Sequence, residues 1–367
     1  MDTTAVEGYH YRPDTTALET QRIGLQIIRD AVGDEVILDK DGSPMLNPVG
    51  LVDTGRTSAD TGHSFERTKN AASGIAARFY MQRNFFVNDP DAFNVTATHL
   101  MEHAREHSSI TLGAAEASIA LSAVSGGMYE IGDDMLVLGS EKDRLALVEN
   151  RELLNMSKVG QASTPLDLMT YEAEDGQPSI FLLREDQRQA ILTVFNWTNT
   201  VRSHTLQLAD LGLPAGHTFA ATDVLDQNAA IALTSGAVQL ENQPPQSVRV
   251  IKLVDNNVAA AAPTVTAQVP AGANAGDTIV LSAISAQAEA GGVPAVAYHW
   301  EFGDGTNADG AKVSHAYTRA GEFTIRLTVD GVDGVPANKN FSVKVIGNLK
   351  AHSNLIDNRR FVEPTDR

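Results

Sequence analysis

The sequence predicts a multidomain protein in which an α/β part, the second half of a (β/α)8 barrel, precedes two antiparallel β-sandwiches. Units of a helix followed by a short strand fill about the first 160 residues. From about Pro165 the apolar pattern changes to strands separated by turns rich in Asp, Gly, Asn and Pro. An alanine-rich stretch of low complexity, Asn256–Pro263, then separates a last group of strands from the rest.

These observations divide the chain of 367 residues into five parts, and that length is enough for two or three domains. The expected parts are the half-barrel at 1–160, a β-sandwich at 161–255, a linker at 256–263, a second β-sandwich at 264–347 and a polar tail at 348–367.

Helix signals in the first part are local and specific. Thr16-Ala-Leu-Glu19 forms a capping-box pattern, and Gly33 is a stop signal. The apolar spacing predicts further helices at 65–81, 114–124 and 141–159. Apolar runs predict strands at 36–38, 49–52 and 85–87, with a last one at 125–134. Four strands are half of the eight that such a barrel needs, so we expect the sequence to be a fragment.

Composition limits the classes of ligand. The formal net charge of −18 disfavours nucleic acids and anionic membranes as partners, because phosphate groups would be repelled. The chain has no cysteine, so disulfides and thiolate metal sites are excluded, and we expect no metal site and no cofactor. No apolar run approaches the roughly 20 residues of a membrane-spanning helix, and the first 14 residues show no signal peptide.

The run Val49–Val52 leads directly into a group of charged residues. Asp53, Arg56 and Asp60 follow it in quick succession. Because catalytic side chains of parallel α/β proteins gather where the strands end, this turn is a candidate substrate site. The alternative is a surface loop that holds an ion pair.

The run from Thr16 to Asp60 resembles the second half of the TIM-barrel domain of clan D glycoside hydrolases, the α-galactosidase (melibiase) families 27 and 36. Gly42-Ser43-Pro44, Val49–Asp53 and the Arg56-x-x-x-Asp60 pattern fill the family's slots, and looser motifs extend the likeness to about Ile251. The resemblance implies a retaining α-glycosidase with Asp60 as general acid/base and Arg56 bound to a sugar hydroxyl. A capping role for Asp60 at the helix entry is the alternative.

The same resemblance places other residues at the substrate. The candidate substrate-binding set includes Asp53, at the end of the expected strand, together with Lys40 and Asp41. Many α-galactosidases have Cys-Gly in place of Lys40-Asp41, so galactose specificity is in doubt. Asp91, in an Asn-Asp-Pro-Asp element, either lines the pocket wall or caps a turn.

The nucleophile of the family falls upstream of Met1 when its usual spacing is counted back from the helix at Thr16. Asp2 is the alternative nucleophile within the chain. We therefore expect a truncated enzyme that is inactive alone on oligosaccharides or polysaccharides. Other substrates, such as an α-N-acetylgalactosaminide or an α-glucoside, remain open. The rival interpretation is a non-catalytic extracellular carbohydrate-binding or adhesion protein with a vestigial barrel.

The last sandwich carries a specific motif set. Trp300-x-Phe-Gly-Asp-Gly, then His315-x-Tyr317, then Gly321-x-Phe323 resemble the polycystic kidney disease (PKD) domain, which has an Ig-like sandwich fold. PKD modules occur mostly on extracellular proteins, so this resemblance implies an extracellular or periplasmic location and a contact of the PKD domain with polysaccharide or protein. Trp197 and Trp300 are expected to be core residues.

Overall fold

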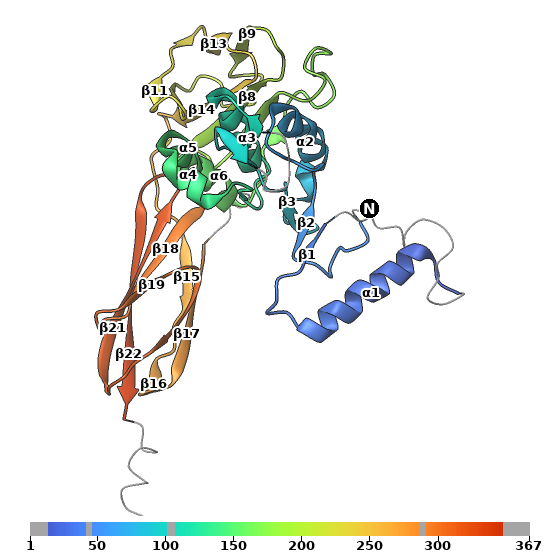
Figure 1. Ribbon diagram of the computed structural model, residues 1–367. Coiled ribbons are helices and arrows are strands. Elements are labelled where there is room, and N and C mark those ends of the chain that lie inside the picture. The colour runs from blue at the N-terminus through green and yellow to red at the C-terminus, as the bar shows by residue number, and fades with distance from the viewer. Residues whose placement is uncertain (1–13, 42–45, 101–106, 286–290, 348–367) are drawn as a thin grey trace, which may run out of the picture. The chain divides into compact units, whose positions relative to one another are not determined.

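A computed structural model describes residues 14–41, 46–100, 107–285 and 291–347 (Figure 1). The chain forms two compact units, Met1–Ala259 and Ala260–Arg367. The stretch Gly42-Ser43-Pro44, Asp2 and the tail 348–367 lie outside the described residues. None of the helices in the described ranges is both long and apolar enough to cross a membrane.

The expected helices of the first unit are confirmed, with one correction. Helix α1 spans Ala17–Val32 with the capping box of Thr16 and Glu19, α2 spans Phe65–Arg78 and continues as a 3-10 turn Phe79–Met81, and α3 spans Leu112–Val124. The single helix expected at 141–159 is wrong. Helices α5 (Lys142–Val148) and α6 (Arg151–Val159) replace it, because Asn150 caps a new helix by accepting the N–H groups of Glu152 and Leu153. Helix α4, Met135–Ser140, precedes them.

A parallel sheet of three short strands carries the order β1-β2-β3, with β1 at Asp39–Lys40, β2 at Thr54–Arg56 and β3 at Val87–Asp89. The strands expected at 36–38, 49–52 and 85–87 are therefore placed too early. The residues 46–51 form turns instead, since the N–H of Leu51 bonds to the carbonyl of Pro48 at 2.8 Å. Val52 is still buried, against Met81 and Phe86.

The strand expected at 125–134 is reduced to an isolated parallel bridge between Phe93 and Ile131. The backbone nevertheless runs along β3, where the N–H of Met128 bonds to the carbonyl of Asn88 at 2.8 Å. Gly127 permits this approach, because a Cβ there would lie 2.0 Å from that carbonyl oxygen. A separate hairpin pairs β4 (Thr98–Leu100) with β5 (His107–Ser109).

The rest of the first unit is a β-sandwich, as expected from the apolar pattern. One sheet has the order β11-β10-β14-β8-β7-β6 and the other the order β12-β13-β9. The strands are β6 Thr164–Pro165, β7 Ile180–Arg184, β8 Gln189–Asn196, β9 Arg202–Gln207, β10 Phe219–Asp223, β11 Ala229–Ala230, β12 Leu233–Thr234, β13 Ala237–Gln243 and β14 Ser247–Asp255. Helix α3 is buried almost all round and packs against β14 (Figure 1).

The second unit is also a two-sheet sandwich, with orders β15-β17-β20 and β16-β22-β21-β18-β19. Its strands are β15 Val265–Gln268, β16 Gly272–Asn274, β17 Thr278–Ser285, β18 Ala295–Glu301, β19 Asn307–Asp309, β20 Lys312–Ala316, β21 Gly321–Gly331 and β22 Pro336–Ile346. Trp300 is fully buried here and Trp197 is buried in the first unit, each with its indole N–H bonded to a backbone carbonyl, so both are core residues as predicted.

Candidate functional site

Charged residues of three strands converge at the carboxyl edge of the parallel sheet. Lys40 pairs with Gly55 and Arg56 pairs with Asp89, so the three strands end side by side. Asp41 follows β1, Asp60 follows β2 and Asp91 follows β3. Arg56 and these three aspartates, called the strand-end cluster below, occupy the place where α/β folds carry their chemistry.

Arg56 is the centre of the strand-end cluster. Its guanidinium group bonds to Asp41 at 3.0 Å, to Asp60 at 3.1 Å and, more closely, to Asp91. The Arg56 side chain is 13% exposed, whereas Asp41 and Asp60 are 70% and 83% exposed. Within the described part of the chain, the buried Nε of Arg56 has no hydrogen-bond partner. A buried cation therefore holds two carboxylates that remain open to solvent.

Asp91 links Arg56 to the backbone that follows β2. Its Oδ2 atom accepts the backbone N–H of Thr61 at 2.7 Å and the Thr61 hydroxyl at 3.0 Å, besides bonding to Arg56. Its φ of 73° lies in the left-handed region, and its N–H donates to Asp89 at 2.7 Å. These contacts favour the turn-forming role of Asp91, and its contact with substrate stays a prediction.

Asp53 lies apart from the strand-end cluster. It precedes β2, at the end opposite Arg56, and its carboxylate pairs with Arg29 of α1 and accepts the N–H of Leu38 at 2.8 Å. The hydrogen bonds from Leu38 and from Arg29 lower the pKa of Asp53. Lys40 lies buried within β1. The structure thus brings Arg56, Asp41, Asp60 and Asp91 together and does not bring Asp53 to them.

Two further carboxyl groups near this edge were not singled out from the sequence. Burial raises the pKa of Asp89, and the charges of Asp39 and Asp91 act in the same direction. Burial also raises the pKa of Glu130, with Asp89 as the next contribution. The acidic Asn-Asp-Pro-Asp run signals Asp89, but nothing local signals Glu130, which reaches the site only through the chain segment beside β3.

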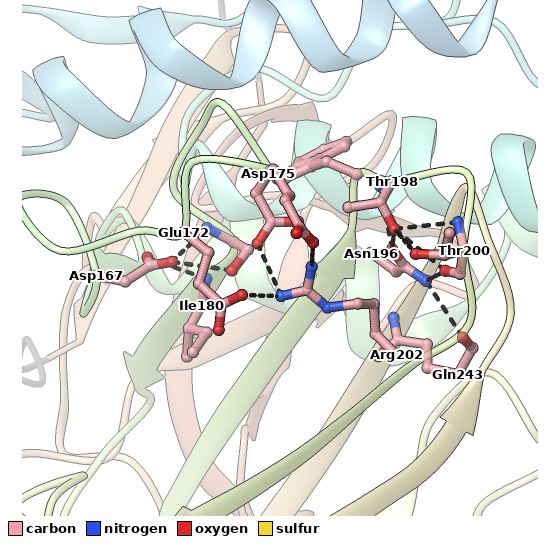
Figure 2. Close-up of polar contacts among 12 residues, drawn as sticks. Asp167, Glu172, Asp175, Ile180, Asn196, Thr198, Thr200, Arg202 and Gln243 are labelled. Atoms are coloured by element: carbon pink, nitrogen blue, oxygen red, sulfur yellow. Dashed lines mark hydrogen bonds and ion pairs between the residues drawn. The ribbon is translucent and has the colours of Figure 1, made fainter.

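A second polar cluster lies in the β-sandwich and is closed upon itself (Figure 2). Arg202 pairs with Glu172, with Glu174 at 3.1 Å and with the buried Asp175 at 3.6 Å. Asp167 accepts the N–H groups of Ser179 and Ile180. Because its members bond mainly to one another and to backbone, this cluster ties the 167–177 loop to the sandwich and offers little to a ligand.

Comparison with known proteins separates the two units. The family model described as PKD domain matches residues 260–345. The second unit is a PKD domain. A curated relative, collagenase ColA of Clostridium perfringens, is 38% identical over 50 residues, which is 14% of this chain and 4% of the collagenase.

Solved structures share the fold of the first unit. A family GH27 β-L-arabinopyranosidase from Geobacillus stearothermophilus, in complex with arabinose, has a TM-score of 0.53 at 15% identity over 64% of this chain and 55% of that one. A putative α-galactosidase/melibiase from Bacteroides fragilis also has a TM-score of 0.53 at 15% identity, over 67% and 53%. Since the PKD unit is under a third of the chain, most of each match lies in the first unit.

These likenesses confirm the expected resemblance in fold to family 27, and at 15% identity they concern the fold alone. The predicted fold class, mixed α/β followed by all-β, is confirmed with them. The chain spans about half the length of the solved structures that it matches.

Proposed function

We propose that the first unit supplies half of the active site of a retaining α-galactosidase-like glycosidase that removes terminal α-linked sugars from oligosaccharides or polysaccharides. The observation that carries this proposal is Arg56 holding the exposed Asp60 carboxylate at the carboxyl edge of a parallel sheet. A general acid must reach the departing oxygen, and an 83% exposed carboxylate fixed by a 13% exposed arginine is accessible and oriented.

In this mechanism Asp60 donates a proton to the leaving oxygen and then accepts one from the water that cleaves the glycosyl-enzyme. Arg56 positions Asp60. A sugar hydroxyl can take the place of Asp41 on Arg56, because the Asp41 carboxylate is already exposed and stays in contact with solvent when it is displaced. Asp91 holds the other side of Arg56 throughout, since Thr61 fixes its carboxylate.

The nucleophile comes from polypeptide outside the described residues. Retention needs a second carboxylate about 5–5.5 Å from the first, across the scissile bond. The exposed apolar face of α1 supports a missing neighbour: no residue of this amphipathic helix is buried, and Ile27 is 61% exposed. Apolar residues of this kind pack against adjacent helices in a complete barrel. The matched structures, about twice the length spanned here, agree with this.

The PKD domain supports an extracellular location for the whole protein, as does the likeness of part of the chain to a collagenase. We include in the proposal that the PKD domain contacts polysaccharide or protein.

The test compares this chain with the longer protein encoded by a continuous reading frame upstream of Met1. The chain alone should turn over no aryl α-glycoside. In the longer protein, Asp60→Ala should lower kcat/KM about 10²–10⁴-fold for poor leaving groups and far less for activated ones. Glu241→Ala, at an exposed position of β13 in the sandwich, is the matched control and should have no effect.

Equal losses for both kinds of leaving group would remove Asp60 from the acid/base role. An upstream frame without further helix–strand units and a Lys-x-Asp motif would favour the non-catalytic carbohydrate-binding protein.

A further inference from the structure

The first unit contains a pocket that is separate from the strand-end cluster. It has a volume of about 510 Å³ and lies between the start of α3 and the turn that joins β13 to β14. The two walls are packed closely, because a Cβ at Gly113 would lie 3.3 Å from the carbonyl oxygen of Gln246. None of the residues that line this α3–β14 pocket belongs to the strand-end cluster.

One wall presents an acid that no described residue pairs with. Glu116 lies one helical turn into α3, is half-buried, and lines the pocket. Among the described residues, no group donates a hydrogen bond to its carboxylate. Asp223 and Asp226 of the sandwich and Arg144 of α5 act on its charge, and burial together with Asp223 raises its pKa to about 7. A desolvated carboxyl group that faces a pocket is poised to accept a hydrogen bond from a ligand.

The opposite wall presents a donor. Arg249 of β14 gives its Nε–H to the buried Asp223, which fixes the guanidinium plane. Within the described ranges its two terminal nitrogens donate to no protein group, and Arg249 lines the pocket. Donor and acceptor therefore come from different elements, 133 positions apart in sequence, and both are held by their own element.

The remaining lining is apolar apart from Thr111 and Ser247, whose hydroxyl groups bond to the backbone of Ala114 and Pro244. Leu112 is 43% exposed, and Pro244 and Pro245 present rigid ring faces in the β13–β14 turn. Carboxylates outnumber arginines around the pocket, which disfavours an anion. A ligand that covers proline rings with C–H groups while offering hydroxyls to Glu116 and Arg249 is a neutral polyhydroxylated ring.

We propose that the α3–β14 pocket binds one neutral sugar ring of a glycan, away from the strand-end cluster. Glu116 accepts a hydrogen bond from a sugar hydroxyl, Arg249 donates one to a ring or hydroxyl oxygen, and the proline faces cover the apolar side of the sugar. Such a site would hold a glycan on the first unit independently of catalysis. The proposal stands whether or not Asp60 is an acid/base catalyst.

The test is saturation-transfer NMR and titration of the whole chain with D-galactose, L-arabinose and D-glucose, and with n-butylammonium as a cationic probe. A site of this size should bind at least one sugar with a dissociation constant on the order of millimolar. Glu116→Ala should weaken that binding at least tenfold. Arg249→Lys, which keeps a positive charge beside Asp223 and so preserves the fold, should also weaken it.

A control variant locates the site. Glu66→Gln, on the exposed side of α2, should leave sugar binding unchanged. The proposal is overturned if no sugar binds at a concentration about 50-fold above the millimolar dissociation constant expected here. It is also overturned if Glu116→Ala and Arg249→Lys bind the sugar as the parent does, or if n-butylammonium alone shows the dependence on Glu116.

Discussion

Replacing Glu116 by glutamine should stabilise the first unit at neutral and alkaline pH and leave its stability unchanged in acid. Burial, with the charge of Asp223, raises the pKa of Glu116 from 4.5 to about 7. The native state then binds the proton more tightly than the unfolded chain does. The free energy of unfolding therefore falls as the pH rises from 4.5 to about 7 and is constant above that window.

The size of the effect follows from the pKa difference. The full difference would correspond to about 3 kcal/mol, at 1.36 kcal/mol for each pH unit. Glu116 is only half-buried and solvent screens its charge, so we expect about 1–2 kcal/mol. Glutamine has the shape of the neutral carboxyl group. The variant should thus match the parent at pH 4 and exceed it by about 1–2 kcal/mol at pH 8.

The assay is urea unfolding followed by tryptophan fluorescence. The chain has two tryptophans, so a Trp300→Phe background leaves Trp197 to report on the first unit alone. Glu241→Gln, at an exposed position of β13, is the control for loss of a surface charge. A stability difference between Glu116→Gln and its parent that is the same at pH 4 and pH 8 would refute the reasoning.

Two further outcomes follow from the structure. Gly127→Ala should destabilise the first unit by about 3 kcal/mol, because the new Cβ would meet the Asn88 carbonyl oxygen at 2.0 Å, whereas Gly139→Ala, with no heavy atom within 4 Å, should be neutral in the same urea assay. In the PKD domain, burial raises the pKa of Asp304, but hydrogen bonds from Thr306 and from His315 more than offset this and leave the pKa lowered. Calorimetry should therefore show the PKD transition losing stability as the pH falls through the lowered pKa, and Asp304→Asn should abolish that loss. A PKD transition with the same acid sensitivity in both proteins would contradict this.

Features with a local cause could be predicted from the sequence. The capping box of Thr16 and Glu19 starts α1 where the pattern placed it, because both hydrogen bonds lie within four residues. The apolar runs of α3, β8 and β14 likewise predict elements that are buried on nearly all sides, as they are in the structure. The PKD motif was specific enough to identify its domain, since Trp300 and Tyr317 fill one core.

Strand positions in the parallel sheet could not be predicted in the same way. The apolar runs at 36–38 and 49–52 predict burial, but a strand exists only where a neighbour supplies hydrogen bonds. Those neighbours face Asp39–Lys40 and Thr54–Arg56, so the strands begin later than the apolar runs do. The helix expected at 141–159 failed for a related reason, since one asparagine side chain redirected the backbone at Asn150.

For the candidate sites the same division holds. The sequence by itself determined which residues carry charge near a strand end, Arg56 and Asp60 among them, because the order of the chain places them there. Only the tertiary structure decided that Asp41 and Asp91 join Arg56 while Asp53 turns to Arg29. It alone placed Glu116 and Arg249 around one pocket. Ion pairs and pockets depend on distances between segments remote in sequence, and the packing of strands and helices sets those distances.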